Sequence, residues 1–471
     1  MTVVDRPPRA GAGSGAVPAG SGLRVTVDSV DELDPVALYA AARELDLEAA
    51  LWLQPADGFA LVGIGRAWAV EADGPGRFTG AAAAWTGLAA ELGQPGAWPR
   101  GAGPVLLGGL GFSPRQPADP AWTGFGAASL VLPRTCLALT PAGAWATSVI
   151  GPHDPAEPGR GGPGEYVTPF DRLAARARAI SPAPGAIAAR PVGAWLTETG
   201  SRPDRAAWDR LVGLYAGAVG RGRLDKVVLA RRVDLRSSIE LDVPNALRRL
   251  AASAPESTVF AFSRAARTFL GATPERLVRT EGRAFATVAL AGSVRRGIDV
   301  AEDAALAAEL LSSEKEREEH GVVVDSLRAS LAPLCESLEV DRVPGVMRLR
   351  DVQHLVTEVR GRLHRQAGML ALAEVIHPTA AVGGEPRELA LELIAEHEGF
   401  ERGWYAGPVG WVDAAGDGEL AVALRSGLVA GTGAMLFAGC GIMADSDPDR
   451  EWEESEVKLR AVVGALGRFD R

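Results

Sequence analysis

Residues 402–443 read RGWYAGPVGWVDAAGDGELAVALRSGLVAGTGAMLFAGCGIM, a series of apolar runs separated by glycine-rich segments. Such runs, with turn residues between them, predict three strands, near 404–413, 419–430 and 434–443, joined by AAGDG and GTG turns. Short turns between consecutive strands produce antiparallel pairs. We therefore expect an antiparallel meander, followed by an acidic helix that begins at about Asp449.

Helices are predicted on the N-terminal side of this meander. Asp299 with Glu302, and Ser313 with Glu316, have the spacing of capping boxes, which begin two consecutive helices. The other elements predicted before the meander are a helix through Trp208 and Tyr215, a strand at 226–235, and a helix that starts near Pro386 and ends at Gly399. Strands, helices and antiparallel strands without regular βαβ alternation indicate an α+β fold built on large antiparallel sheets.

The composition is that of a globular protein without general affinity for nucleic acid or membranes. The 471 residues include 49 Lys and Arg against 59 Asp and Glu, a formal charge of −10, which argues against nucleic-acid and anionic-membrane partners. The longest uncharged run, 427–444, contains five glycines and fits two buried strands better than a membrane helix. Three cysteines without a CxxC pair suit a reducing compartment, so a cytoplasmic location is expected.

Two stretches rich in Pro and Gly, 151–164 and 181–185, divide the chain unequally. Residues 1–23 are rich in Pro, Gly, Ala and Ser without the apolar core of a signal peptide, so we expect a disordered leader. Residues 24–195 are predicted to form strands with a few helices. Residues 196–471 contain the candidates for chemistry, and we expect the two parts to form one integrated domain.

Two ionisable residues stand where acid–base chemistry could use them. Lys226 lies in the apolar strand LDKVVLA, where burial disfavours the ammonium form, as a lysine base requires. The alternative is an edge-strand lysine that faces water. Glu275 follows a strand predicted to end at Leu270, and a partly apolar cleft would raise its pKa and make it an acid. The alternative is a turn carboxylate paired with Arg276.

Carboxylates gather in two further segments, SEKEREEH at 313–320 and DSDPDREWEESEVK at 445–458. Such charge runs are usually solvated helix faces, and Lys315 and Glu319 have the i,i+4 spacing of an ion pair. Because GVVV follows the first run, its end is predicted to enter the core, where a buried carboxylate needs a cation. Oxygen ligands from two distant helices would suit Mg²⁺ with several waters retained.

Motifs of several other common sites are missing. The six histidines show no HExxH or paired Cys/His spacing for zinc, and the sequence has neither GxSxG nor GxxxxGK[ST]. Gly108-Gly-Leu-Gly111 lacks the full dinucleotide fingerprint, so we expect a strand-end turn there.

Nine segments between about Arg205 and Leu466 resemble, in order, the chorismate-binding enzymes, and most closely the isochorismate synthases. They are LDKVVLAR, FLGATPERLV, ALAGSVRRG, SEKEREEHGVVV, QHLVTEVRG, IHPTAAVGGEPR, RGWYAGPVGW, ELAVALRS and AGCGIMADSDPDREWEESEVKL. The resemblance implies two large antiparallel sheets packed as a sandwich, with surrounding helices and an active site in a deep cleft. It also implies a monomeric, Mg²⁺-dependent isomerase that converts chorismate reversibly to isochorismate, adding water at C2 with loss of the C4 hydroxyl.

The resemblance implies a role for each matched residue. Lys226 matches the general base that acts on water, and Glu275 matches the general acid toward the departing hydroxyl. Glu319 and Glu454 match ligands of Mg²⁺, and Glu451 matches an acidic residue that acts through metal-bound water. Gly292 and Ser293 match residues that line the reacting ring, and His354 matches a histidine of the same cleft. The residues matched to contacts with the substrate carboxylates are Tyr405, Arg425, Lys458, Gly439 and Gly441, the two glycines through their backbone N–H groups.

Two positions distinguish the implied activity within the family. Ala291 stands where aminodeoxychorismate synthases carry a nucleophilic lysine, and anthranilate synthases lack a base lysine at the position of Lys226. Water is therefore the implied nucleophile, and no glutamine amidotransferase partner is expected. The alternative is a salicylate synthase, which uses the same residues and then eliminates pyruvate. The resemblance leaves menaquinone and siderophore biosynthesis open as the pathway, and the intact acid, base and ligand set argues against a non-catalytic binder.

Overall fold

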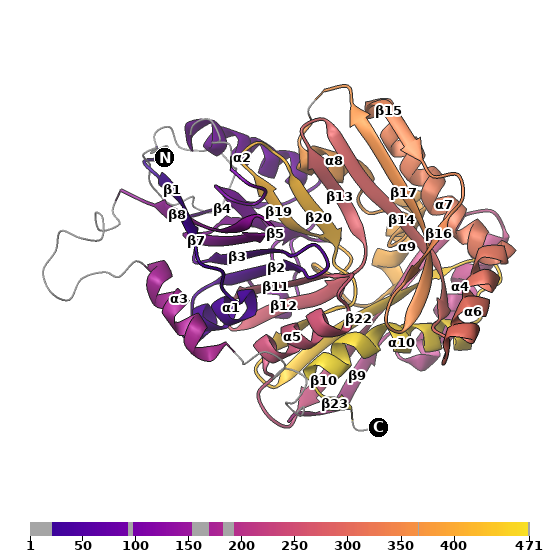
Figure 1. Ribbon diagram of the computed structural model, residues 1–471. Helices are drawn as coiled ribbons and strands as arrows, with labels where there is room; N and C mark the ends of the chain where they lie inside the picture. Colours follow the sequence, from indigo (N-terminus) through magenta and orange to yellow (C-terminus); the bar gives the residue numbers. More distant parts are fainter. Residues whose placement is uncertain (1–20, 93–97, 153–168, 182–192, 366, 470–471) are drawn as a thin grey trace, which may run out of the picture.

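Two large sheets organise the residues that the computed structural model describes, which are 21–92, 98–152, 169–181, 193–365 and 367–469. Over these ranges the larger sheet has 13 strands and the smaller sheet has 10. Strand β23 pairs with β9 in parallel, whereas the large ladders, such as β10 with β22 and β14 with β17, are antiparallel. The prediction of an α+β fold on large antiparallel sheets is confirmed (Figure 1).

The strands of the larger sheet are, in spatial order, β1 (Arg24–Val30), β8 (Gly143–Ile150), β7 (Thr135–Thr140), β3 (Phe59–Ile64), β2 (Ala49–Gln54), β11 (Thr258–Arg264), β12 (Arg267–Thr273), β21 (Ser426–Ala430), β22 (Gly433–Ile442), β10 (Lys226–Ser237), β9 (Trp195–Arg202) and β23 (Arg468–Phe469), with β18 (Gly384–Glu385) paired to β10. Those of the smaller sheet are β15 (Cys335–Val340), β17 (Val352–Leu363), β14 (Ala284–Arg295), β13 (Arg276–Glu281), β20 (Gly418–Val422), β19 (Pro408–Asp413), β5 (Val105–Leu110), β6 (Ala128–Leu132) and β4 (Trp68–Ala72), with β16 (Gly345–Arg348) paired to β17. The α-helices are α1 (Pro35–Glu44), α2 (Arg77–Leu92), α3 (Pro169–Ile180), α4 (Arg205–Gly220), α5 (Val243–Ser253), α6 (Val300–Ser312), α7 (Glu314–Leu331), α8 (Met369–Ile376), α9 (Arg387–His397) and α10 (Pro448–Leu466).

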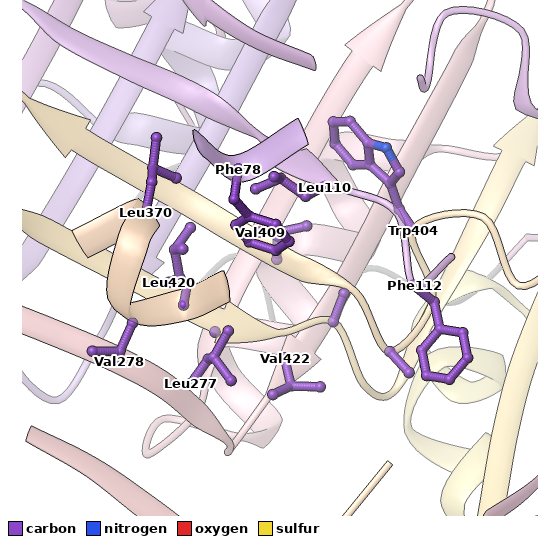
Figure 2. Packing of buried hydrophobic residues seen from close by; sticks show 14 of the residues in the cluster. Phe78, Leu110, Phe112, Leu277, Val278, Leu370, Trp404, Val409, Leu420 and Val422 are labelled. Carbon is purple, nitrogen blue, oxygen red and sulfur yellow. The ribbon is translucent and has the colours of Figure 1, made fainter. Parts of the chain in front are cut away.

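Apolar side chains form two core layers. One layer joins α1, α3, α5 and α10 to the outer face of the larger sheet, along which these helices lie in Figure 1. The other contains residues of both sheets together with α2, α4, α7 and α8. Figure 2 shows part of this second layer, where Phe78 and Leu370 pack near Val409 and Leu420 of β19 and β20. Neighbouring residues of one strand belong to different layers, as Leu51 and Trp52 of β2 do, so both faces of the larger sheet are covered there.

Strands from the two halves of the chain are neighbours in both sheets. Strand β2 pairs with β11, and β5 pairs with β19, so each sheet joins residues before position 195 to residues after it. The expected leader, 1–23, lies mostly outside the described residues, and Leu23 at its end is buried. Most of 151–164 and 181–185 also lies outside them. None of the helices described is long and apolar enough to cross a membrane.

The prediction of a single strand over 419–430 is wrong, and so is that of one continuous meander, because β19 pairs with β20 in the smaller sheet and β21 with β22 in the larger one. The chain forms β20, leaves the smaller sheet after Val422, and enters the larger sheet as β21 at Ser426. Between them Arg425 has a φ of 48°, a left-handed conformation that a non-glycine residue adopts only where its surroundings hold it. The sequence at this point is Arg425-Ser426-Gly427, and the Ser-Gly pair is a turn signal that the prediction of one continuous strand passed over. The strands on either side, 408–413 and 433–442, are confirmed with small shifts of their ends.

The predicted turn at Gly108-Gly-Leu-Gly111 is also wrong for its first two glycines, which lie inside β5. A Cβ at Gly108 would stand 2.2 Å from the carbonyl oxygen of Ser129 on β6, so this strand needs glycine for close backbone approach. The predicted helix starts at Asp299 and Ser313 are confirmed, since both side chains accept hydrogen bonds from backbone N–H groups of the first turn.

Candidate active site

A cavity of about 750 Å³ opens where β10 and β22 meet β14, α7 and α10. Because its walls come from both sheets, the cavity lies at the junction that the crossing at Arg425 creates. It is lined by all but one of the residues that the sequence singled out, namely Lys226, Glu275, Gly292, Ser293, Glu319, His354, Tyr405, Arg425, Gly439, Gly441, Glu454 and Lys458. The remaining residue, Glu451, lies beside Glu454 in one cluster of possible ligand atoms.

Lys226 is the first residue of β10, and its side chain is only 1% exposed. Its Nζ lies 2.8 Å from Oε1 of Glu319 on α7. The alternative of an edge lysine facing water is therefore wrong, and so is the alternative i,i+4 pair, because Lys315 lies against Asp445 instead. Because this ion pair is largely removed from water, the side chains of Lys226 and Glu319 hold each other in one position.

Glycines 439 and 441 allow β22 to form one wall of this cavity. A Cβ at Gly441 would stand 2.3 Å from Oε1 of Glu319 and 2.6 Å from Cε of Lys226, so any larger residue would push the pair apart. The β10 partners of the two glycines donate their N–H groups elsewhere, Ala230 to Glu398 and Val228 to Gly383. The pairs Val228–Gly441 and Ala230–Gly439 are therefore non-hydrogen-bonded pairs of the antiparallel ladder, and the N–H groups of both glycines point away from β10. On that side β22 is paired with β21 only up to Phe437, opposite Ser426, so both glycines lie past the end of this pairing.

Glu275 lies between β12 and β13 and is 4% exposed. Burial raises its pKa to about 7, although the cations Lys226, Lys458 and Arg425 act in the opposite direction. The alternative of a pair with Arg276 is wrong, because Arg276 binds Glu419 at 3.1 Å. A buried carboxyl group that gives up its proton near neutral pH is suited to act as a general acid.

Arg425 and His354 hold each other in a defined state. Nη2 of Arg425 donates to Nε2 of His354 at 2.9 Å, and Nδ1 of His354 lies 3.3 Å from the carbonyl oxygen of Gly292. Because a guanidinium can only donate, Nε2 accepts and the ring carries its proton on Nδ1. Burial, with the charge of Arg425, lowers the pKa of His354 well below its ordinary value, and burial lowers that of Arg425 to about 10. The ring is therefore neutral and the guanidinium charged at neutral pH.

A second ion pair lies on α10, within one turn. Nζ of Lys458 lies 2.7 Å from Oε1 of Glu454 and donates to the carbonyl oxygen of Gly439 at 2.8 Å. Burial alone would lower the pKa of Lys458, but the charge of Glu454 has the larger effect, so the pKa of Lys458 is raised. Burial alone would raise the pKa of Glu454, but the charge of Lys458 has the larger effect, so the pKa of Glu454 is lowered. Both groups are thus ionised. Ser293 donates its hydroxyl to Glu454 at 2.9 Å, and Tyr405 stacks on Phe437 with ring centroids 5.1 Å apart.

Carboxylates of α7 and α10 crowd one side of the cavity. Burial and the neighbouring Glu319 raise the pKa of Glu316, and burial with Glu454 raises the pKa of Glu451. Ligand atoms of Glu451, Glu454 and Cys440 lie within 4.8 Å of one another. The Cys440 thiol, whose pKa burial raises well above its ordinary value, keeps its proton and donates to the backbone of Glu451. The donors that are left are hard carboxylate oxygens with excess negative charge, which fits Mg²⁺.

Sequence reasoning missed Glu316 as a member of this group. Its spacing from Ser313 indicated a capping box, in which the glutamate side chain returns to the cap residue. Instead, Oε2 of Glu316 accepts the N–H of Ser293 at 2.8 Å, and Ser313 gives its N–H to Glu309. The signal that could have found it is its i,i+3 relation to Glu319, which places both carboxylates on one side of α7.

Comparisons with known proteins show which sequences and folds this chain is similar to. A family model described as chorismate binding enzyme matches residues 21–467. The chain is 37% identical over 446 residues to the salicylate biosynthesis isochorismate synthase of Pseudomonas aeruginosa, covering 94% of this chain and 90% of that protein. It is 35% identical over 371 residues to isochorismate synthase MenF of Bacillus subtilis, covering 78% and 75%. Its fold matches the structure of MenF, the menaquinone-specific isochorismate synthase of Escherichia coli, with a TM-score of 0.74, 26% identity, and coverage of 98% and 96%.

Proposed function

The chain belongs to the chorismate-binding enzyme family, and on that premise we propose that it is an isochorismate synthase, an isomerase that converts chorismate reversibly to isochorismate. The observation that carries the proposal is that Lys226 and Glu275, a candidate base and a candidate acid, line one cavity with the cations needed for a dicarboxylate. A hydroxyl is a poor leaving group, so exchange of a ring hydroxyl requires both kinds of group.

Binding is assigned to the positive side of the cavity. Chorismate carries two carboxylates, and Arg425 with Lys458 supplies charge-assisted hydrogen bonds that an acidic protein must provide locally. The outward N–H groups of Gly439 and Gly441 add donors that need no ionisation. Tyr405, fixed by its stacking on Phe437, and the neutral His354 complete the proposed substrate contacts.

Catalysis is assigned to the two remaining ionisable groups. Lys226 acts in its neutral amine form, in which it removes a proton from the water that attacks C2, and Glu275 gives its proton to the hydroxyl that leaves C4. Each such partner typically contributes about 10²- to 10⁴-fold in rate. Glu319 and Glu454 are the proposed Mg²⁺ ligands, and Glu451 acts through a water. When bound, Mg²⁺ supplies positive charge that holds a substrate carboxylate and weakens the hold of Glu319 on Lys226.

Water as the nucleophile implies that the enzyme works without an amidotransferase subunit, and we propose that it does so as a monomer. A reducing cytoplasm is the proposed location, because Cys136, Cys335 and Cys440 are all free and buried. The named relatives include one in salicylate biosynthesis and one that is menaquinone-specific, so either pathway is compatible with the same reaction.

The proposal is tested by incubating the purified protein with chorismate and Mg²⁺ and separating the products chromatographically. We expect isochorismate in equilibrium with chorismate, approached from either side, without pyruvate. Chelation of Mg²⁺ is expected to stop turnover, and added Mg²⁺ to restore it. Stoichiometric pyruvate and salicylate would make the protein a salicylate synthase instead. Unchanged chorismate with a folded, Mg²⁺-loaded protein would contradict both assignments.

A further inference from the structure

A second cavity, of about 720 Å³, lies on the opposite face of β10 from the catalytic cavity. Lys226 and Val228 face the catalytic cavity, whereas the alternate residues Arg231, Val233 and Leu235 line the second one. Helix α10 forms its other wall, and in Figure 1 this helix lies along β10 and β9. None of the predicted site residues lines this second space.

Arg231 gives the second cavity a buried cation with unused hydrogen-bond donors. Its side chain is 1% exposed, and its guanidinium lies 3.7 Å from the ring centroid of Trp452. Nη2 donates to Glu456, but Nε and Nη1 are buried and have no partner. Buried N–H groups of a charged side chain are costly to leave unpaired, so this position favours a ligand that accepts hydrogen bonds.

Most of the remaining wall is apolar, and its other charged residues are Glu198, Glu456 and Arg460. Val233, Leu235, Leu436, Leu459, Val463 and Phe469 surround Arg231. The two arginines and two glutamates balance in formal charge, but of these four described side chains only Arg231 has buried N–H groups without a partner. A ligand with one carboxylate and a compact apolar body would pair with these donors and pack on the aliphatic wall. We propose that this cavity is a binding site for a benzoate-like monocarboxylate, whose acid group meets Arg231 and whose ring packs between α10 and the strands β10 and β22.

Such a ligand would act on the proposed enzyme as an effector, because α10 and β10 are shared by both cavities. Glu454 and Lys458 of α10 face the catalytic cavity, while Glu456 and Leu459 of the same helix face the second one. A carboxylate at Arg231 competes with Glu456 for the guanidinium that packs on Trp452, next to Glu451. Two sites coupled through one rigid element alter each other's affinity reciprocally. This effector role rests on the proposed function, whereas the binding site itself does not.

The binding site is tested by isothermal titration of the full-length protein with salicylate and with benzoate, and with benzamide as the uncharged probe. The catalytic cavity is kept occupied by Mg²⁺ and an equilibrated chorismate mixture. We expect one salicylate or benzoate per chain, and at least tenfold weaker binding of benzamide. Arg231→Met, which removes the cation, and Gly464→Phe, which fills the cavity, should each weaken salicylate binding at least tenfold.

Gly464 suits the blocking variant because a Cβ there meets nothing within 4 Å. Gly213 on α4 has the same open surroundings away from the cavity, so Gly213→Phe is the matched control and should bind as the wild type does. Absence of saturable binding to the folded wild type would overturn the proposal. So would binding that survives Arg231→Met and Gly464→Phe but is lost in Arg425→Met, because that ligand would lie in the catalytic cavity.

The effector role has its own measurement. Salicylate is expected to change the KM for chorismate at least twofold in the wild type and to leave Gly464→Phe unaffected, while both proteins keep the same turnover without salicylate. Equal inhibition of both proteins would overturn the effector role. A wild type without any turnover of chorismate would contradict the proposed function, and it would leave the titration result to be judged separately.

Discussion

At Glu275 burial and charge act in opposite directions on one carboxyl group. Burial raises its pKa, while Lys226, Lys458 and Arg425 lower it, and the net value is about 7. Three cations would hold an exposed glutamate ionised over the whole physiological range. Burial thus keeps a proton on Glu275 next to cations that bind an anionic substrate. The same burial lowers the stability of the folded protein at high pH, where Glu275 must be ionised.

That cost can be measured with Glu275→Gln. The folded protein keeps the proton up to a pKa of about 7, whereas the unfolded chain releases it at its ordinary 4.5, so wild-type stability falls as the pH rises between these values. One pKa unit corresponds to about 1.4 kcal/mol, so the stability of Glu275→Gln relative to wild type should rise by about 3 kcal/mol from pH 4.5 to pH 8. Urea unfolding at both pH values measures this. A pH-independent difference, like that expected of the exposed control Glu396→Gln, would contradict the prediction.

Lys226→Ala separates binding from chemistry. The substrate carboxylates are assigned to Arg425 and Lys458, which this substitution leaves in place, so chorismate should still bind in the presence of Mg²⁺. Turnover should fall at least a hundredfold, because the substitution removes the group assigned to take the proton from water. Equilibrium binding and steady-state rates of the same preparation measure the two effects. Turnover near the wild-type rate would remove Lys226 from the mechanism.

The site residues differ in how far the sequence could identify them. Lys226 and Glu275 were recognisable because a charged residue in an apolar strand or after one is a local anomaly, and the alternatives failed only on their partners, Glu319 and Glu419. Glu316 was missed, although it stands three residues before Glu319, because its spacing from Ser313 satisfied the capping-box rule and its side chain instead binds the N–H of Ser293. Competition between local capping and a distant backbone N–H is decided by tertiary structure.

At the scale of elements, a buried ion pair positions the strand that carries Lys226. Arg402 donates to the carbonyl oxygens of Val228 at 2.9 Å and Val382 at 2.8 Å, both of which belong to residues lining the catalytic cavity. Its partner Glu398 accepts the N–H of Ala230 at 2.8 Å. Neither residue was predicted, since a pair four residues apart after a helix end resembles an ordinary surface contact.

Arg402→Met is therefore expected to destabilise the protein by about 3 to 5 kcal/mol, because it leaves the buried Glu398 without a cation. Arg402→Met/Glu398→Met should regain part of this loss, since an uncompensated charge costs more than an apolar pair. Midpoints and slopes of urea unfolding measure both variants. Arg176→Met, which removes an exposed pair with Glu44, is the control and should leave the midpoint unchanged. A double variant no more stable than the single one would contradict this account.

Helices and strands were predictable where capping residues or glycine-rich turns mark their ends. Asp299 and Ser313 begin helices, and the glycine-rich turns on either side of 419–430 separate strands. The crossing at Arg425 was missed because Ser426-Gly427 is a brief turn signal between apolar segments that suit either sheet, and pairing with distant strands assigns each segment to its sheet. The same crossing places the predicted residue Arg425 in the catalytic cavity, so the turn that was missed is one that builds the site.

At the scale of the whole molecule, the two parts of the chain are interleaved. Trp404 is fully buried and contacts Phe125 from the first part and Phe262 and Phe269 from the second. Its indole N–H also donates to the carbonyl oxygen of Gly126 at 2.8 Å. An aromatic cluster shared in this way gives neither part a complete core of its own.

Residues 24–195 and 196–471 are accordingly expected to unfold together as one integrated domain. Separating them would expose the β2–β11 and β5–β19 pairings, leaving long open edges and unpaired backbone groups in both sheets. In urea, tryptophan fluorescence, which reports all eleven tryptophans, including the buried Trp52 and Trp404, should follow the same transition as far-UV circular dichroism, which reports strands and helices. Trp404→Leu should move both signals to lower urea by the same amount, because the cavity it leaves lies in the shared core. Two separate transitions, or a shift of one signal alone, would show that the halves fold independently and that the catalytic cavity between the sheets forms only when they dock.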